Sequence, residues 1–263
     1  MFSDARRIRP GFVTLVGAGP GAADLITVRG LRALQLAEVV LHDELPGTDL
    51  LACCHPDAAL VAVGKRAGAH AAAQAEINRL MVAHARAGRR VVRLKGGDPA
   101  VFGRLGEEVE ALRRAGVEFE VIPGVTAACA AAAAAGVSLT QRGVASAAVL
   151  VTGHECAGKA EPAVDWAALA ASGATLCVYM GARSLAALAD RLVSAGRPAE
   201  TPLVVVSHAS HPTQSLRRAT LGSAAAAADV DATPALVLIG EAVAPAAGAS
   251  AAPPRALAAG LAP

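Results

Sequence analysis

Val91-Val92-Arg93-Leu94-Lys95-Gly96-Gly97-Asp98-Pro99 is the stretch of the sequence that says most about the fold. Its aliphatic start predicts a buried β-strand, and the two glycines predict that the strand ends there. Adjacent glycines let a ligand approach the backbone closely, and Pro99 stiffens the turn. Asp98 could accept hydrogen bonds from a ribose or an amine, but an aspartate at this point is also common as the N-cap of an ordinary helix.

The same succession of strand and Gly-rich loop occurs near the start of the chain, where residues 13–16 precede Gly17-Ala18-Gly19-Pro20-Gly21. Further strands are predicted at 39–41 and 119–122, and helices at 77–84 and 107–115 alternate with them. This alternation is typical of an α/β domain whose parallel sheet is covered on both faces. It also places the two Gly-rich loops at the same edge of the sheet, where α/β proteins bind ligands.

A second α/β domain is predicted in the remaining sequence. An alanine-rich helix at 126–135 stops at Gly136, and we place the domain boundary there, which gives domains 1–136 and 137–245. Beyond the boundary the predicted elements are strands at 147–152, 175–180, 203–207 and 235–239, a helix at 184–195 and a polar edge strand at 213–221. The tail, residues 246–263, is rich in Ala and Pro and is predicted to be disordered.

Composition excludes several classes of protein. The net charge of +2 carries no concentrated basic face, so we expect no nucleic-acid partner. The 5 cysteines contain no C-x-x-C pair and are odd in number, which argues against a disulfide framework or structural zinc and for a reducing compartment. No apolar run reaches the ~20 residues of a membrane span. We therefore expect a cytoplasmic protein without a metal site or a membrane segment.

The first Gly-rich loop leaves a second class of protein open. Gly17-x-Gly19-x-x-Ala22, followed by Asp43, fits the dinucleotide-binding fingerprint and would indicate an NAD-binding oxidoreductase. Pro20 weakens this interpretation, because it removes an N–H that would bind pyrophosphate and promotes a turn before a helix can begin.

Charged residues after the second loop have two interpretations. Arg104 and Glu107 are spaced i, i+3 on the next helix, so they could form a surface ion pair contributing about 0–1 kcal/mol. Alternatively both could point into a pocket, where the planar fork of Arg104 would bind a carboxylate. Arg142 allows the same two interpretations.

An ordered series of motifs resembles the tetrapyrrole methylase family, and within it the uroporphyrinogen-III C-methyltransferases. The resemblance covers residues 12–243, and the motifs that carry it are VGAGPG at 16–21, DLIT at 24–27, VGKR at 63–66, QAEIN at 74–78, RLKGGDPAVFGR at 93–104, EE at 107–108, PGVTA at 123–127, VTGHE at 151–155, YMG at 179–181 and PAL at 234–236.

The resemblance implies two α/β domains of the tetrapyrrole methylase type with a cofactor cleft between them, usually in a homodimer. The cofactor would be S-adenosyl-L-methionine, with S-adenosyl-L-homocysteine as product. The substrate would be uroporphyrinogen III, methylated at C-2 and C-7 to precorrin-2 for siroheme, cobalamin or heme d1 biosynthesis. Enzymes of the same fold that act on a later corrin precursor or on ribosomal RNA are the nearest alternative, although Lys65-Arg66 and residues 74–78 favour the uroporphyrinogen branch. No fused dehydrogenase or ferrochelatase region is recognised, so we expect later siroheme steps to belong to other proteins.

The resemblance also implies roles for individual residues. Arg104 matches a residue linked to catalysis and to substrate carboxylates, with Glu107 beside it, and Asp43 and Lys65 match acid/base positions. Arg142 and Met180 match substrate contacts. The implied cofactor contacts are Pro20, Gly96, Gly97, Asp98, Val101, Thr126, Ala127, Met180, Ala209, Pro234 and Ala235.

The sequence departs from the family pattern at several points. Leu105 replaces a usual glycine and Gln141 a common histidine, Ser207-His208-Ala209-Ser210 replaces an Asn-Gly-Thr loop, and His42 precedes Asp43 where tyrosine is usual. These departures concern the predicted substrate rim and leave both Gly-rich loops intact.

Overall fold

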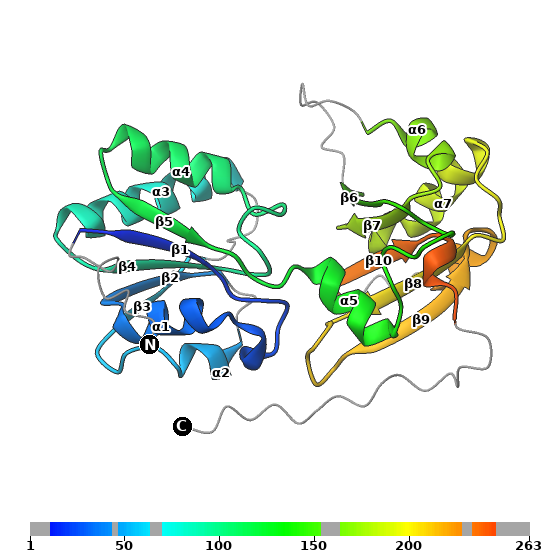
Figure 1. Ribbon diagram of the computed structural model, residues 1–263. Helices are drawn as coiled ribbons and strands as arrows, with labels where there is room; N and C mark the ends of the chain where they lie inside the picture. Colours follow the sequence, from blue (N-terminus) through cyan, green and yellow to red (C-terminus); the bar gives the residue numbers. More distant parts are fainter. Residues whose placement is uncertain (1–10, 44–46, 64–69, 154–163, 228–232, 246–263) are drawn as a thin grey trace. The chain divides into compact units, whose positions relative to one another are not determined.

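The structure is a computed structural model of the chain and describes residues 11–43, 47–63, 70–153, 164–227 and 233–245. It consists of two compact units that divide between Thr126 and Ala127 (Figure 1). This division lies at the start of the alanine-rich helix, whereas the sequence analysis placed the boundary at its end, at Gly136. The helix, α5 (Ala127–Ala135), belongs to the second unit because it packs on strands β8 and β10 of that unit. The predicted tail, 246–263, and Lys65 lie outside the described residues.

The first unit contains the predicted parallel sheet, which has five strands. Its strand order is β3-β2-β4-β1-β5, and its strands are β1 (Val13–Gly17), β2 (Val39–His42), β3 (Ala59–Ala62), β4 (Val91–Lys95) and β5 (Phe119–Ile122). The sequence analysis missed β3, an edge strand that begins and ends with alanine, a weak strand former, and has mostly exposed side chains.

Helices cover both faces of this sheet (Figure 1). One layer holds α1 (Val28–Leu36), the short 3₁₀ turn η1 (Ala23–Leu25) and α2 (Thr48–Leu51), and the other holds α3 (His70–Arg86) and α4 (Leu105–Arg114). Two separate apolar clusters result: Leu34 and Leu50 pack with Val92 on one face, and Met81 and Leu112 pack on the other. Successive residues of β4 therefore point into opposite layers.

The second unit contains a mixed sheet in the order β6-β7-β10-β8-β9. Its strands are β6 (Ala148–Thr152), β7 (Thr175–Tyr179), β8 (Pro202–Ser207), β9 (Ser215–Thr220) and β10 (Ala235–Ile239). Strands β6 and β7 are parallel, whereas β10 runs antiparallel to both β7 and β8. The predicted polar edge strand is confirmed as β9, which lies at the end of the strand order and pairs with β8.

The two faces of the mixed sheet carry different helices. On one face lie α6 (Trp166–Ala171), α7 (Leu185–Ser194), α8 (Ala224–Ala227) and the turns η2 (Ala182–Ser184) and η3 (Leu221–Ser223), and η4 (Glu241–Val243) follows β10. The other face is covered by α5, whose Ala128, Ala131, Ala132 and Ala135 pack against β8 and β10. These alanines recur at i, i+3, i+4 and i+7, so a helix without large side chains can still bury one continuous stripe.

Candidate active site

The two Gly-rich loops of the first unit are joined through their backbones. Strands β1 and β4 are neighbours, and the loops that follow them meet at Gly19 and Gly97, each donating its N–H to the carbonyl oxygen of the other, at 3.2 and 2.7 Å. A β-carbon on Gly17 would lie 2.6 Å from the α-carbon of Gly124, so three backbone segments converge here with no room for side chains. The predicted meeting of both loops at one edge of the sheet is confirmed.

Asp98 ties this junction together. Its Oδ2 accepts the N–H of Gly124 at 2.9 Å and its Oδ1 accepts the N–H of Ala100 at 2.8 Å. The carboxylate therefore stabilises the turn in which it lies, which is close to the N-cap role considered from the sequence. It also holds the loop that follows β5.

The geometry after β1 does not match a dinucleotide-binding fold. In that fold a helix begins at the Gly-rich loop and aims its N-terminus at the pyrophosphate. Here α1 begins only at Val28, where Thr27 caps it by accepting the N–H of Gly30 at 3.1 Å. The sheet order also places β4, rather than β2, beside β1. The NAD interpretation was therefore wrong, because Pro20-Gly21 and the η1 turn separate loop and helix.

The junction nevertheless fits a ligand that approaches the backbone. Gly97 has a φ of +66°, and a β-carbon placed on it would meet no atom within 4 Å. Open space therefore lies beside a backbone segment at the carboxyl ends of β1 and β4. Such a position suits close contact with a bound nucleoside or amino-acid group.

Arg104 and Glu107 form a bidentate ion pair at the start of α4. Arg104 Nε and Nη2 donate to the two carboxylate oxygens of Glu107 at 2.6 and 2.7 Å. The side chains are 41% and 53% exposed, so this guanidinium is accessible while its orientation is held by the carboxylate. This half-exposed pair is compatible with both interpretations from the sequence, a surface ion pair and a guanidinium that binds a carboxylate.

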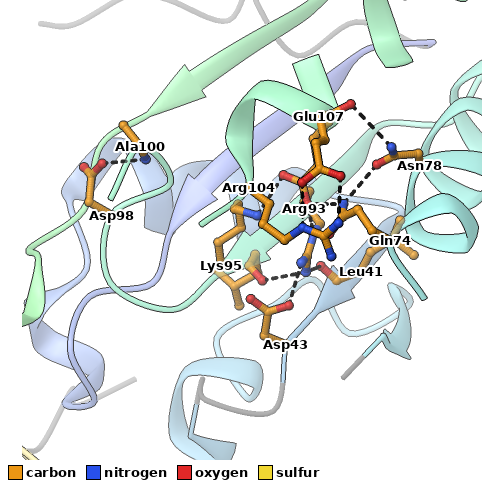
Figure 2. Close-up of polar contacts among 12 residues, drawn as sticks. Leu41, Asp43, Gln74, Asn78, Arg93, Lys95, Asp98, Ala100, Arg104 and Glu107 are labelled. Atoms are coloured by element: carbon orange, nitrogen blue, oxygen red, sulfur yellow. Dashed lines mark hydrogen bonds and ion pairs between the residues drawn. The ribbon is translucent and has the colours of Figure 1, made fainter. Parts of the chain in front are cut away.

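A cluster of charges that are mostly buried, which we call the Arg93 cluster, consists of Asp43, Arg93, Lys95 and Glu108. Figure 2 labels the first three of these residues. Arg93 Nε donates to Glu108 Oε1 at 3.0 Å and Nη2 to Asp43 Oδ1 at 2.5 Å. Lys95 Nζ lies 2.8 Å from Glu108 Oε2. Glu108 is fully buried, while the Asp43 side chain is 29% exposed. The cluster thus balances two cations with two carboxylates and connects the interior to the end of β2.

Burial affects the titration of one member of this cluster, Lys95. Desolvation lowers the pKa of the Lys95 ammonium, and the neighbouring Glu108 carboxylate opposes that shift. The cluster extends through Gln74, whose Nε2 donates to Glu108 Oε1 at 3.3 Å and to Asn78 Oδ1 at 3.1 Å. Asn78 in turn donates to the Glu107 carbonyl at 3.3 Å. Helix α3 is therefore linked both to the buried glutamate and to the turn that carries Arg104.

The remaining predicted residues of the first unit lie in the same loops. Pro20 comes directly after Gly19 in the first loop. Gly96 and Val101 belong to the second loop, which also contains Gly97 and Asp98. Thr126 is the last residue of the unit. Asp43 follows β2 at the same edge of the sheet.

In the second unit the other predicted residues gather at one end of the mixed sheet. Tyr179, the last residue of β7, pairs with Leu236, so Met180 comes at the end where β10 begins with Ala235. Pro234 accepts the N–H of His208 at 2.8 Å, which brings Ala209 to the same end. The Tyr179 hydroxyl accepts the N–H of Ala128 at 3.1 Å and so anchors the start of α5, where Ala127 lies.

Among the described residues, five other than glycine have a left-handed backbone, with φ between 50° and 67°, and all lie in loops that follow strands: Phe102, Arg104, Met180, His208 and Ser210. Each such residue costs on the order of 1–3 kcal/mol relative to a relaxed backbone. Met180 is also 56% exposed. The strain is concentrated on loops that carry predicted site residues.

Arg142 belongs to the second unit. It is exposed in a tight turn closed by a pair of hydrogen bonds between Gln141 and Ala145, each 2.9 Å long. Among the described residues there is no group of three His, Cys, Asp or Glu side chains suited to a metal ion. No helix in the described ranges is long and apolar enough to cross a bilayer.

Arg93, Lys95 and Glu108 lie within the motifs that resemble the family, but no role was predicted for them from the sequence. A signal was present, because charged residues at alternate positions of a strand predicted to be buried need partners. Helical spacing also carried a signal, because Glu108 lies at i, i+3 and i+7 spacing with Leu105 and Leu112, which pack on the core, whereas Glu107 does not. The structure accordingly separates the two glutamates into an exposed and a buried carboxylate.

The two units and the converging Gly-rich loops are those of a class of α/β methylases. A family model of tetrapyrrole (corrin/porphyrin) methylases matches residues 13–225, and the chain belongs to that family. The predicted family and the two-unit α/β fold are thereby confirmed.

Curated relatives and solved structures agree with this assignment. Siroheme synthase of Tolumonas auensis is 48% identical over 231 residues, covering 88% of this chain and 49% of the relative. Siroheme synthase of Neisseria meningitidis serogroup C is 49% identical over 233 residues, covering 89% and 48%. The chain therefore spans about half the length of these relatives.

Two solved structures are similar over nearly their whole length. A cobalt precorrin-4 methyltransferase superposes with a TM-score of 0.80 at 33% identity, covering 89% of this chain and 97% of that one. The uroporphyrin-III C-methyl transferase of Thermus thermophilus, complexed with S-adenosyl homocysteine, gives 0.74 at 41% identity, covering 88% and 92%.

Proposed function

We propose that this chain is a uroporphyrinogen-III C-methyltransferase that methylates C-2 and C-7 and releases precorrin-2. Its methyl donor is S-adenosyl-L-methionine. The observation that carries the proposal is the 41% identity, over 88% of the chain, to the Thermus thermophilus uroporphyrin-III C-methyl transferase. The siroheme synthase relatives support the same substrate class.

The geometry of the first unit supports binding of this donor. The cofactor supplies an activated methyl group, so the protein has chiefly to align it with an electron-rich pyrrole carbon. The open backbone at Gly97 and the joined loops suit close contact with such a ligand. We assign cofactor contacts to Pro20, Gly96, Gly97, Asp98, Val101 and Thr126 of the first unit, and to Ala127, Met180, Ala209, Pro234 and Ala235 of the second.

Substrate binding requires cations, because uroporphyrinogen carries many carboxylates. Arg104 is exposed and its planar fork is held by Glu107, so it can bind a carboxylate without losing much side-chain freedom. We assign Arg104 and Glu107 to catalysis and substrate binding, and Arg142 and Met180 to further substrate contacts.

Acid/base chemistry is assigned to Asp43 and Lys65. Forming a carbon–carbon bond at the pyrrole leaves the macrocycle with an excess positive charge, and loss of a proton from carbon neutralises it. Asp43 offers a partly exposed carboxylate at the edge of the sheet that could accept this proton. Lys65 lies outside the described residues and keeps its role from the resemblance. We further propose that the enzyme is a cytoplasmic homodimer.

An anaerobic assay with uroporphyrinogen III and S-adenosyl-L-methionine tests the proposal, with mass spectrometry of the tetrapyrrole as readout. The expected result is a product that has gained both methyl groups. If adenosylhomocysteine binds but no methyl group is transferred, the substrate assignment is wrong and the methylase assignment stands.

A later corrin precursor is the second candidate substrate. The higher TM-score, 0.80 against 0.74, belongs to the cobalt precorrin-4 methyltransferase. We rank it second because its sequence identity is lower, 33% against 41%. The same assay with a cobalt-containing corrin precursor distinguishes the two.

A further inference from the structure

Arg93 occupies an unusual position for an arginine. It lies in the central strand β4, is 2% exposed, and projects from the same face as Val91, which belongs to the apolar core. All three guanidinium nitrogens are engaged. Nε binds Glu108, Nη1 donates to the carbonyls of Leu41 and Leu94 at 3.4 and 3.2 Å, and Nη2 binds Asp43.

Stability alone is a poor explanation for this arrangement. Removing charges from water costs several kcal/mol per ion in general, and well-packed apolar residues often replace a buried ion pair without loss of stability. One member of the Arg93 cluster differs from the others, because Asp43 is partly exposed at the end of β2. The cluster therefore connects a buried, rigid guanidinium to one accessible carboxylate.

The guanidinium is fixed by the sheet itself. Leu41 belongs to β2 and Leu94 to β4, and these neighbouring strands hold Arg93 through backbone carbonyls. Its bond to Asp43 Oδ1 then sets the orientation of the carboxylate, although Asp43 begins a loop. In the part of the chain that the structure describes, no other group donates a hydrogen bond to this carboxylate, which leaves Oδ2 for a proton.

We propose that Arg93 is a positioning residue that orients the Asp43 carboxylate for removal of the proton from the methylated macrocycle. The inference rests on the proposed function and deepens it. In this step the carbon–hydrogen bond breaks, its electron pair neutralises the cationic macrocycle, and the proton passes to Asp43. Arg93 is buried and acts only through Asp43.

Arg93→Lys is the variant that tests this role, because it keeps the charge and removes the fork. A lysine cannot bind two carboxylates and two carbonyls in one plane. We expect kcat to fall by about 10-fold or more, with KM and the Kd of adenosylhomocysteine within about 3-fold of wild type. Arg93→Gln, which keeps a planar donor, replaces this variant if the lysine form does not fold.

Arg197→Met is the matched control. Arg197 is 5% exposed in the second unit and donates to the Ala174 carbonyl at 3.0 Å, and neither residue is among those assigned to the site. Loss of this buried arginine should lower the melting temperature and leave kcat unchanged when assayed well below that temperature. A merely structural role for Arg93 predicts the same behaviour as in this control.

A double-mutant cycle with Asp43→Asn gives the decisive readout. If Arg93 acts through Asp43, adding Arg93→Lys to Asp43→Asn should lower kcat by less than about 2-fold further. If the two losses multiply instead, Arg93 does not act through Asp43 and the inference is overturned. Both comparisons need a wild-type enzyme that methylates uroporphyrinogen III; absence of that product overturns the proposed function itself, and the inference with it.

Discussion

The backbones of Gly17 and Gly124 touch so closely that a β-carbon on Gly17 would lie 2.6 Å from the Gly124 α-carbon. The contact joins the end of β1 to the loop after β5, and Asp98 reinforces it through its bond to the Gly124 N–H. Because only backbone atoms face each other, neither side can yield without moving a strand end.

Gly17→Ala should therefore destabilise the first unit. We expect the free energy of unfolding to fall by about 1–3 kcal/mol, the usual cost of overpacking. Binding of adenosylhomocysteine should weaken as well, because the loops would separate. Chemical denaturation and calorimetric titration measure these effects, and an alanine variant with unchanged stability would contradict the close contact.

Gly97→Ala should behave differently, because its β-carbon would meet no protein atom. The positive φ alone costs about 1–2 kcal/mol for an alanine. Gly116→Ala is a matched control, since Gly116 has a φ of +67° and equally open space but lies at the end of α4, outside the proposed site. We expect similar stability for both variants and weaker adenosylhomocysteine binding only for Gly97→Ala. Equal affinities would remove Gly97 from the cofactor site.

Glu107 and Glu108 are adjacent in sequence and should respond in opposite ways. Glu108→Gln would remove a fully buried counter-charge from Arg93 and Lys95, so we expect a loss of about 3–5 kcal/mol in unfolding free energy. Glu107→Gln would weaken a half-exposed pair and should cost no more than about 1 kcal/mol. Urea denaturation of both variants decides this, and comparable losses would refute the assignment of buried and exposed carboxylates.

Arg104→Ala should lower turnover while adenosylhomocysteine binds as in wild type. The guanidinium is the accessible partner of its ion pair and is proposed to hold substrate carboxylates. Loss of a charged hydrogen-bonding partner is commonly worth about 1.5–3 kcal/mol, or roughly 10–150-fold in kcat/KM. Arg113→Ala serves as control, because Arg113 lies on the same helix over the Phe119 ring. Unchanged turnover in Arg104→Ala would exclude Arg104 from the mechanism.

Cysteine reactivity tests the second unit. Burial raises the pKa of the Cys177 thiol to about 11, whereas Cys129 on α5 is exposed. A pKa that high leaves roughly one thiol in a thousand ionised at pH 8. Iodoacetamide at pH 8 should therefore modify Cys129 and spare Cys177, as measured by peptide mass spectrometry. Labelling of both at similar rates would contradict the burial of Cys177 on β7, between β6 and β10.

Much of this architecture could be predicted from the sequence, because β-branched runs and helical periodicity are local signals. The parallel sheet, the edge strand β9 and the meeting of the Gly-rich loops all follow from such signals. The complete Arg93 cluster was not predicted, because its members come from three separate elements. Alternate charges on β4 indicate that Arg93 and Lys95 need partners, but not that Asp43 and Glu108 supply them. The domain boundary was misplaced for a related reason: an alanine helix carries no mark of which sheet it packs on.

The left-handed residues Phe102, Arg104, Met180, His208 and Ser210 have a practical consequence for engineering. Glycine at any of them would relieve about 1–3 kcal/mol of backbone strain against an entropic cost of about 0.5–1 kcal/mol, so we expect a net gain in thermal resistance. A library screened only for survival of heating would thus accumulate glycine at these loops, including the proposed ligand contacts Arg104 and Met180. We expect such thermostabilised variants to bind their ligands poorly. A selection for thermostability in this methylase should therefore include a screen for turnover in the same round.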